Sequence, residues 1–312
     1  MTDAIRITDP ADPRVVHFRA VRDGDLRGRD GLFCVESPRA VRRFLYALLA
    51  ARAGAPSAPH VRLNSLLLTP ATVDALGSLE ARARLCTADG RTAPLFVADT
   101  AVMSRLAGYK MHMGALALGE RPTSPTLDQL LTALETHHHL LVPTGVVHPD
   151  NMGAIFRNAG SFANAGVLLA EGSTDPLNRK AIRISAGRVF SVPWGQTSDL
   201  SGDLIRLRRD HGFAIVAAED SDDAIELDEL FARGHFAHAP RIAVILGAEG
   251  HGVRSQLRSQ CDATSVIGMG DPRRVASPLI ESTDRPSLNV AVASALFLHR
   301  LRSRSGHPSA ER

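Results

Sequence analysis

The sequence predicts an α/β fold built as two domains, and three observations lead to this prediction. Short apolar runs rich in β-branched residues alternate with stretches that begin with helix-start signals. The chain has 312 residues, of which 44% are hydrophobic, so it can form two cores of ordinary size. A segment rich in proline, serine and threonine lies between the two halves. We therefore expect domains at residues 1–118 and 127–302, a linker at 119–126 and a disordered tail at 303–312.

The front domain is predicted to be a small α/β unit. Residues 1–30 show little periodicity and are expected to form a loosely packed arm. Three strand-like runs follow, and each leads into a segment that begins with a capping residue, twice with a proline after it. The predicted strands cover residues 32–35, 61–68 and 95–98, and the predicted helices cover residues 39–53, 70–82 and 100–107.

The second domain is predicted to contain a parallel sheet, because strands and helices alternate through it. Its predicted strands cover residues 140–143, 167–170, 213–217, 242–246 and 264–267. Its predicted helices cover residues 127–136, 178–189, 204–211, 255–261 and 287–301, with one more after residue 151.

Composition argues against several classes of protein. No run of eighteen apolar residues is present and the N-terminus does not resemble a signal peptide, so we expect a cytoplasmic protein without a membrane segment. The three cysteines form no C-x-x-C pair, which indicates neither disulfides nor zinc. Consecutive histidines at 137–139 do not converge on one ion, so they are interpreted as a solvated helix end and no metal is expected. The acidic run at 219–229 is interpreted as a solvated face.

Positive charge is unevenly distributed along the chain. The formal net charge is +3, and arginine supplies nearly all the positive charge because Lys110 and Lys180 are the only lysines. Residues 1–121 hold 17 basic and 12 acidic side chains, a balance of +5, which leaves −2 for the remainder. Arginine suits phosphate oxygens, so the surplus is compatible with RNA contact, and it is equally compatible with an ordinary surface.

The stretch at residues 241–253 is predicted to be a buried strand that runs into a glycine-rich turn. The turn contains Gly247, Gly250 and Gly252, with Glu249 among them. The spacing G-x-x-G-x-G with no lysine matches neither the dinucleotide fingerprint nor the phosphate loop, and a carboxylate would repel a pyrophosphate. A dehydrogenase is therefore disfavoured. A loop that binds a cofactor without phosphate and a purely structural turn both remain open.

Two further segments place polar residues at predicted helix starts. In N-M-G-A-I-F-R-N-A, Asn151 and Arg157 are six residues apart and can face the same rim. In S-L-N-V-A-V-A-S-A, the Ser287 hydroxyl and the Asn289 amide can point into a site. Taken singly, each segment is also typical of an ordinary capped helix.

Taken in this order, the segments resemble those of the SpoU-type (TrmH-like) RNA ribose 2′-O-methyltransferases of the SPOUT superfamily. The pattern is N-x-G-x-x-R-x-A, then G-x-E-x-x-G-V after a strand, then I-x-M followed by S-L-N-V-A-V-A. A block at residues 183–193, R-x-S-x-G-x-x-F-x-x-P, is also similar to that family. The resemblance covers residues 127–302. More loosely, the first domain resembles the ribosomal-L30e-like substrate-binding domain, through F-C-V-E-S at residues 33–37.

The resemblance implies an enzyme that uses S-adenosyl-L-methionine to methylate rRNA or tRNA, with rRNA favoured by the front domain. It also implies a deep trefoil knot and an obligate homodimer whose active site lies at the subunit interface. The cofactor carries a sulfonium and no phosphate, so glycines and a carboxylate suit it better than a cationic cradle. The residues expected to bind it are Leu246, Gly247, Gly252, Ile267, Met269, Ser287 and Leu288.

The resemblance also implies roles for the polar residues. Arg157 is assigned the central catalytic role, and because arginine is a very poor base we expect it to clamp the phosphate beside the target ribose. Asn151, Ser287 and Asn289 are expected to orient the hydroxyl and order the loop. Glu249 is expected to hold loop amides or the partner subunit, with direct action as a base as the alternative.

The sequence departs from the family pattern in two places. Gly268 stands where the family has a proline, which loosens a turn that proline would fix. Residues 271–286 form an insertion beside the expected cofactor pocket and are interpreted as a lid, an RNA-contacting loop or a disordered segment. A non-catalytic RNA-binding relative of the same fold is the alternative function, which the joint presence of the five expected catalytic residues disfavours.

Overall fold

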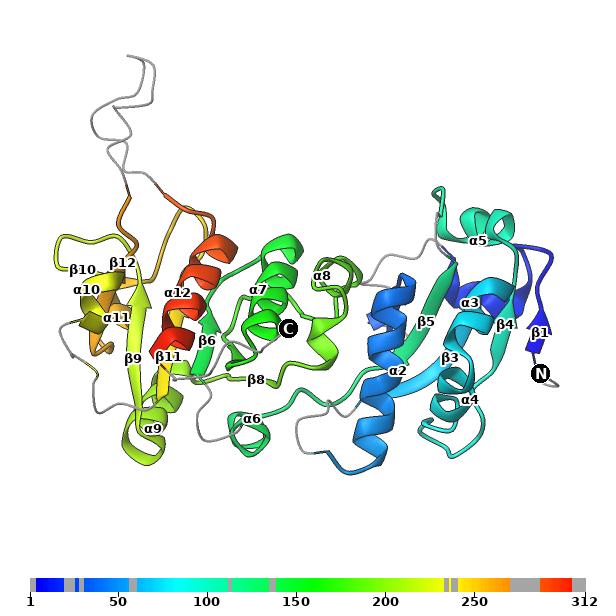
Figure 1. The fold of residues 1–312 in the computed structure, drawn as a ribbon, viewed down its shortest axis with the longest axis horizontal. Coiled ribbons are helices and arrows are strands. Elements are labelled where there is room, and N and C mark those ends of the chain that lie inside the picture. The colour runs from blue at the N-terminus through cyan, green and yellow to red at the C-terminus, as the bar shows by residue number, and fades with distance from the viewer. Residues whose placement is uncertain are drawn as a thin grey trace, which may run out of the picture. The chain divides into compact units, whose positions relative to one another are not determined.

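The computed structural model describes residues 4–19, 26–27, 31–55, 61–111, 114–134, 139–232, 236, 241–269 and 287–304 (Figure 1). The chain forms two compact units, each with its own sheet. The first unit comprises Met1–Ala133, His148–Arg157 and Thr174–Pro193, and the second comprises Leu134–Val147, Asn158–Ser173 and Trp194–Arg312. The α/β fold class is confirmed, and the domain boundaries expected from the sequence stay a prediction.

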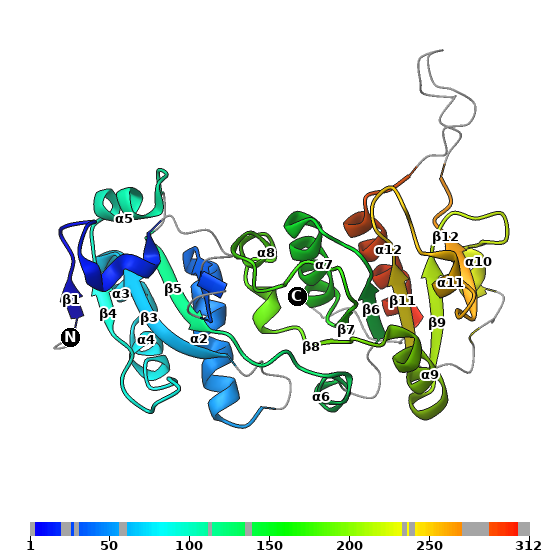
Figure 2. The ribbon, with the colours of Figure 1, turned by 180° about the vertical axis from the view of Figure 1, so that it is seen from behind.

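The first unit contains a five-stranded mixed sheet in the order β1-β4-β3-β5-β2, and Figure 2 shows β3 and β5 side by side within it. Strand β5 is antiparallel to both of its neighbours, and the other pairs are parallel. No strand was expected at β5, whose last two residues fall in the predicted linker. The five strands are β1 (Ala4–Arg6), β2 (Leu32–Glu36), β3 (Arg62–Leu68), β4 (Leu95–Val97) and β5 (Ala115–Glu120).

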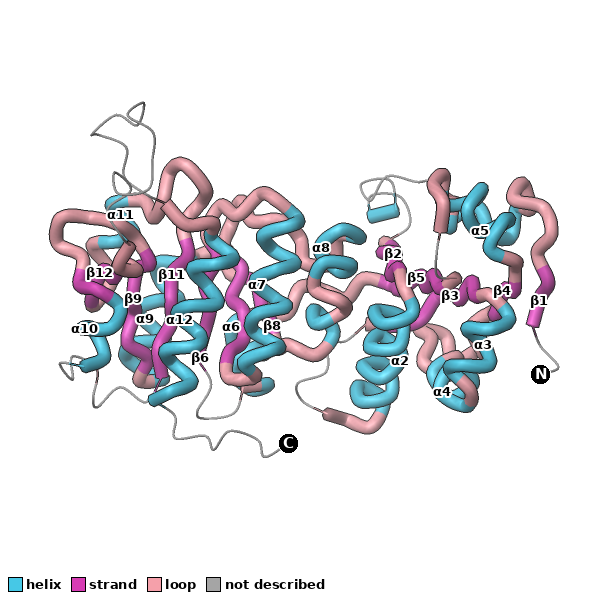
Figure 3. The backbone as a smooth tube through the Cα atoms, turned by 45° about the horizontal axis from the view of Figure 1, so that its top comes forward, coloured by secondary structure: helices cyan, strands magenta, loops and turns pink. Residues whose placement is uncertain are grey.

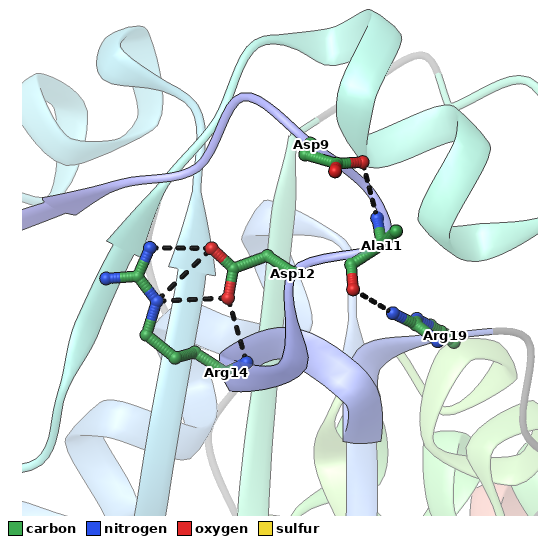
Figure 4. Close-up of polar contacts among 5 residues, drawn as sticks. All are labelled: Asp9, Ala11, Asp12, Arg14 and Arg19. Carbon is green, nitrogen blue, oxygen red and sulfur yellow. Dashed lines mark hydrogen bonds and ion pairs between the residues drawn. The ribbon is translucent and has the colours of Figure 1, made fainter.

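The expectation of a loosely packed arm at residues 1–30 is wrong for its described part. Strand β1 pairs with β4 at the sheet edge, and the side chains of Ile7, Val15 and Phe18 are buried. Val15 and Phe18 lie on the 3-10 helix η1 (Pro13–Phe18). The Asp12 carboxylate caps its first turn by accepting a hydrogen bond from the backbone N–H of Arg14 at 2.9 Å (Figure 4). The segment therefore covers the core of this unit.

Most helices of the first unit begin at the positions that the capping residues in the sequence predicted. Ser37 caps α2 and Asp99 caps α5 through side-chain acceptors. One predicted helix is broken in two, because Gly77 lies between α3 and α4 with a φ of 53°. The helical segments are α2 (Pro38–Arg52), α3 (Pro70–Leu76), α4 (Ser78–Ala83), α5 (Thr100–Ala107), α6 (Leu127–Ala133), α8 (Arg179–Ile184) and 3-10 helix η2 (Arg188–Phe190), together with the first part of α7 (Pro149–Phe162).

The second unit contains a seven-stranded sheet in which every pair is parallel, as predicted. The order is β10-β12-β9-β11-β6-β7-β8, and Figure 3 shows β12, β9, β11 and β6 as neighbours. Strand β11 is therefore central, and residues 242–246 are buried, as a strand covered on both faces requires. The strands are β6 (His139–Pro143), β7 (Ala165–Leu169), β8 (Trp194–Gln196), β9 (Phe213–Ala218), β10 (Ile225–Glu226), β11 (Arg241–Leu246) and β12 (Ala263–Val266).

The helices that complete the second unit are α9 (Leu200–His211), α10 (Leu227–Ala232), α11 (Ser255–Arg258) and α12 (Val290–Arg304). Helix α12 packs on β11 and α10, and Figure 1 draws it in red over the sheet. It begins three residues later than predicted, and α7 begins two residues before Asn151. Strands β8 and β10 and helix α10 were not expected. Of the predicted tail, the structure describes the first two residues, which continue α12.

The interpretation of the histidine run as a solvated helix end is wrong for His139. Its side chain is buried on β6, and its Nδ1 accepts a hydrogen bond from the backbone N–H of Ile242 at 3.1 Å. The other two histidines lie outside the described residues. Within the described part of the chain, no group of three or more histidine, cysteine, aspartate or glutamate side chains could hold a metal ion. No helix there is both long and apolar enough to cross a membrane.

Cys261 is expected to react slowly with alkylating reagents at neutral pH. Burial, with a smaller effect from the neighbouring Asp262 carboxylate, raises the pKa of its thiol to about 11. Because the thiolate is the reactive form, alkylation of the folded protein by iodoacetamide should accelerate about tenfold per pH unit up to that value. Peptide mass spectrometry at a series of pH values measures this rate at Cys261. A rate that levels off below pH 9 would contradict the assignment.

Candidate active site

A pocket of about 720 Å³ lies in the second unit, where strands β9, β11 and β12 end and helix α12 begins. In a parallel sheet these carboxyl ends share one edge, which is the usual place for a ligand in an open α/β fold. The lining residues are Ala218, Glu219, Asp220, Leu246, Gly247, Ala248, Glu249, Gly250, His251, Gly252, Ser265, Val266, Ile267, Met269, Ser287, Leu288, Asn289, Val290, Ala293 and Phe297.

The turn after β11 folds back tightly on itself. The backbone N–H of Gly252 donates to the carbonyl of Ala248 at 2.9 Å, and these two residues form an isolated antiparallel bridge. A side chain at position 247 has no space, because a Cβ there would lie 2.2 Å from the carbonyl carbon of Gly252. Gly250 and Gly252 have φ values of 79° and 59°, which favour glycine. Each glycine therefore has a steric reason, and the turn presents backbone groups to the pocket.

Asn289 connects this turn to helix α12. Its side-chain Nδ2 donates to Glu249 Oε1 at 2.9 Å, and its Oδ1 accepts from the backbone N–H of Ala291 at 2.9 Å. The second contact places Asn289 as a cap at the start of α12. Asn289 thereby holds Glu249 at the rim of the pocket, and this contact is compatible with the role expected of Asn289, which is to order the loop.

Glu219 also braces the turn, and sequence reasoning missed it. Its Oε2 accepts from the backbone N–H of Val253 at 2.7 Å, and a Cβ on Gly252 would lie 2.2 Å from the same oxygen. The sequence placed Glu219 in an acidic run interpreted as a solvated face, whereas here it lines the pocket. Its position directly after a buried parallel strand is the signal that could have identified it.

The charges that line the pocket suit a cationic ligand. Glu219, Asp220 and Glu249 supply carboxylates, and neither lysine nor arginine is among the described residues that line it. Such a pocket disfavours a pyrophosphate and suits a sulfonium and an ammonium group. The volume is within the range of cofactor sites. The residues present therefore fit S-adenosyl-L-methionine.

Comparison with known proteins identifies the family. Residues 138–299 match the model of the SpoU rRNA Methylase family, which covers more than half of the chain. The chain belongs to the SpoU rRNA methylase family.

Named relatives of this SpoU family member agree with the assignment. The chain is 34% identical over 218 residues to an uncharacterized tRNA/rRNA methyltransferase of Mycobacterium tuberculosis, and the alignment covers 70% of this chain and 69% of the relative. It is 29% identical over 214 residues to the 23S rRNA (guanosine-2'-O-)-methyltransferase RlmB of Ralstonia nicotianae, covering 68% and 78% of the two chains.

Solved structures show that the fold extends over nearly the whole chain. An AdoMet-bound rRNA methyltransferase from Sinorhizobium meliloti aligns with a TM-score of 0.70 at 19% identity, over 96% of this chain and 98% of that one. The SpoU methyltransferase AviRb from Streptomyces viridochromogenes, in complex with AdoMet, aligns with a TM-score of 0.65 at 22% identity, over 93% and 96%. The SpoU protein thus has the SPOUT methyltransferase fold.

The residues that the sequence predicted for cofactor binding all line the same pocket. They are Leu246, Gly247, Gly252, Ile267, Met269, Ser287 and Leu288. The expected catalytic residues Glu249, Ser287 and Asn289 line it as well. Their roles stay predictions. The insertion at residues 271–286 lies outside the described residues.

The other two expected catalytic residues, Asn151 and Arg157, lie on α7 in the first unit. Asn151 is buried and Arg157 is exposed to solvent. Gly153, between them, lets α7 approach α8 closely, because a Cβ there would lie 2.7 Å from the carbonyl oxygen of Ala181. The glycine of this motif is therefore explained by helix packing.

Proposed function

We propose that this SpoU family member transfers a methyl group to a ribose 2′-hydroxyl of ribosomal RNA in the cytoplasm. It is an RNA methyltransferase and its cofactor is S-adenosyl-L-methionine. The observation that carries the proposal is the anionic pocket at the ends of β9, β11 and β12, built from the family's own motifs. The name of the RlmB relative, a 23S rRNA (guanosine-2'-O-)-methyltransferase, supports the choice of rRNA and of the 2′-hydroxyl.

The chain's own residues have separate tasks in this reaction. The bound cofactor supplies an electrophilic methyl group on a sulfonium. Backbone groups of the turn after β11 hold the ligand, while buried side chains such as Leu246 and Phe297 exclude water behind it. Asn289 fixes Glu249, and Glu219 fixes the far side of the turn, so the site is ordered before RNA binds. Arg157 clamps the phosphate beside the target ribose and stabilises the developing alkoxide.

The proposed function is tested by methyl transfer to purified RNA. The protein is incubated with methyl-labelled S-adenosyl-L-methionine and either protein-free ribosomal RNA or total transfer RNA, and the modified nucleoside is identified by mass spectrometry. We expect a 2′-O-methylated nucleoside at one position of rRNA. A base-methylated nucleoside, or label in transfer RNA alone, would contradict the proposal. Cofactor binding without transfer to any RNA would favour the non-catalytic relative.

A homodimer is expected in solution, and helix α12 is the proposed contact surface. Val292 and Leu296, four residues apart on this helix, are 48% and 39% exposed although both are large and apolar. Burial of such a face in a partner subunit would stabilise a dimer. Light scattering at micromolar concentration should give twice the 33.4 kDa chain mass. Leu296→Glu should shift the protein toward monomer, and a wild-type monomer would exclude the dimer.

A further inference from the structure

Four arginines come together in the first unit, and none of them lines the pocket. We name Arg39, Arg43, Arg157 and Arg188 the arginine cluster. Arg39 and Arg43 lie four residues apart on α2 and so share one face of that helix. Arg188 is the first residue of η2, and Arg157 lies on α7. The four positions span 150 residues of sequence, so only the fold brings them together.

Direct contacts join α2 to the turn that precedes Arg188. The Arg43 guanidinium donates from Nη1 to the carbonyl oxygen of Ala186 at 2.6 Å. Gly187 has a φ of 77°, and a Cβ there would lie 2.9 Å from the Cα of Ala40. The backbone before Arg188 therefore rests on the first turn of α2, between the two α2 arginines in sequence.

Buried contacts hold this arrangement in place. The rings of Phe44 and Phe190 pack in a tilted arrangement with centroids 4.9 Å apart, and Phe33 packs against both. All three rings are almost fully buried. Arg179 Nε pairs with Glu36 Oε2 at 3.2 Å, which ties α8 to the end of β2. Arg43 and Arg188 thus extend from backbone that tertiary packing fixes, which lowers the entropy lost when they bind a ligand.

Arg157 approaches the same region through α8. Gly153 lies one helical turn before Arg157, and a Cβ there would lie 2.8 Å from Ile184 Cβ. Ile184 is the last residue of α8, two residues before the Ala186 carbonyl that Arg43 contacts. Residues four apart share a helix face, so Arg157 lies on the side of α7 that faces the end of α8.

The positive charges of the cluster repel one another. Burial first, and then the charges of Arg188, Arg39 and Arg157, lower the pKa of the Arg43 guanidinium. Arg39, Arg43 and Arg188 form no ion pair with any carboxylate in the part of the chain that the structure describes. The first turn of α2 also contains no acidic residue. Arg39, Arg43 and Arg188 are like charges held together with no carboxylate partner among the described residues, which raises the free energy of the folded protein. A bound anion would offset that cost.

We propose that the arginine cluster binds consecutive backbone phosphates of the RNA substrate, so that α2 and η2 hold the strand whose ribose Arg157 engages. The inference rests on the proposed function, since Arg157 belongs to both. Arginine forks bind phosphate oxygens in pairs, and a row of them on packed elements suits a polyanionic strand.

The test compares variants of the cluster with a matched control on the same helix. Arg39→Ala and Arg188→Ala each remove one charge from the cluster. Arg42→Ala removes the same charge from α2, where the guanidinium instead donates to the Ala75 carbonyl at 3.0 Å. The affinity of the intact protein for protein-free ribosomal RNA is measured over a series of salt concentrations. Thermal unfolding and cofactor affinity of each variant are measured in parallel.

Loss of one phosphate contact should reduce the salt dependence of log Kd by about 0.7 to 0.9 and weaken binding about tenfold at low salt. We expect this for Arg39→Ala and Arg188→Ala and not for Arg42→Ala. The two cluster variants should unfold at the same temperature as the wild type or higher, because a repulsion is removed. Arg39→Lys should retain the salt dependence, since it keeps the charge.

If both cluster variants bind RNA as Arg42→Ala does, the inference is overturned. Arg39 is exposed, so Arg39→Ala decides the result if Arg188→Ala unfolds early or loses cofactor affinity. Methylation of the same RNA by the wild type separates the two proposals. If the wild type methylates the RNA and the variants do not differ in RNA affinity, the proposal for the arginine cluster is overturned and the proposed function stands. If the cluster variants bind RNA more weakly but the wild type methylates no RNA, the proposed function is overturned and the cluster proposal stands.

Discussion

Replacement of Gly247 by valine is expected to reduce affinity for S-adenosyl-L-methionine by about two orders of magnitude. A Cβ at this position would lie 2.2 Å from the carbonyl carbon, 2.4 Å from the carbonyl oxygen of Gly252 and 2.5 Å from the backbone nitrogen of Val253. These are backbone atoms and cannot rotate away, so the turn must open or shift. Loss of two or three backbone contacts of about 1 kcal/mol each gives this order of magnitude.

Isothermal titration calorimetry of the cofactor measures the effect, and Gly247→Ala should already show most of it. Gly212→Asn is the control, because Gly212 ends α9 in the left-handed region with no atom near its missing Cβ. Asparagine tolerates that conformation, so this variant should bind the cofactor as the wild type does. Wild-type affinity in Gly247→Val would show that the turn after β11 does not hold the ligand.

The central strand and the pocket motifs could be predicted because local signals and tertiary needs agree there. Residues 242–246 form a continuous apolar run rich in β-branched residues, as is typical of a strand at the middle of a parallel sheet. The glycines at 247, 250 and 252 each meet a steric demand of the turn. The identity of the ligand came from the combination of motifs, since a single glycine-rich turn is compatible with several ligands or with none.

Strand β5 could not be predicted because the glycine within it is required by packing against a neighbouring strand and not by a turn. Gly119 reads as the start of a linker, whereas a Cβ there would lie 2.2 Å from the ring of Phe33 on the neighbouring strand. The strand also pairs with β2 and β3 in antiparallel orientation, over separations that no local pattern reports. The prediction of a loosely packed arm at residues 1–30 failed for a similar reason, since β1 is a three-residue edge strand whose partner strand lies about ninety residues away in the sequence.

Glu219 and the arginine cluster show a different limit of sequence reasoning. A carboxylate within an acidic run normally lies in solvent, and only the placement of β9 beside β11 brings Glu219 to the turn. Arg39, Arg43 and Arg188 are three of many arginines in a chain with almost no lysine. These arginines lie close together because η2 packs on α2. A contact between two elements that are far apart in the sequence produces no periodic pattern from which it could be predicted.

Replacement of Arg157 is expected to reduce methyl transfer about a hundredfold without changing cofactor affinity. Arg157→Ala removes a charge-assisted contact in the transition state, which is worth about 3 kcal/mol. Arg157→Lys keeps the charge and loses the planar fork, so its rate should also fall steeply. Arg157 is exposed and helical, so neither substitution should disturb folding. Single-turnover methylation of ribosomal RNA and calorimetry of the cofactor measure the two quantities. Arg105→Ala, an exposed arginine on α5, is the matched control and should methylate at the wild-type rate.

The lysine variant also separates the two roles that an arginine could have in this reaction. If the side chain at position 157 removed the hydroxyl proton, lysine would be the better base, because its ordinary pKa of about 10.4 lies well below that of arginine. The rate of Arg157→Lys would then match or exceed the wild type and rise steeply with pH. If the side chain clamps a phosphate, charge remains but the paired contacts do not, so the rate stays low and its pH profile follows that of the wild type. A near wild-type rate for Arg157→Ala would exclude both roles.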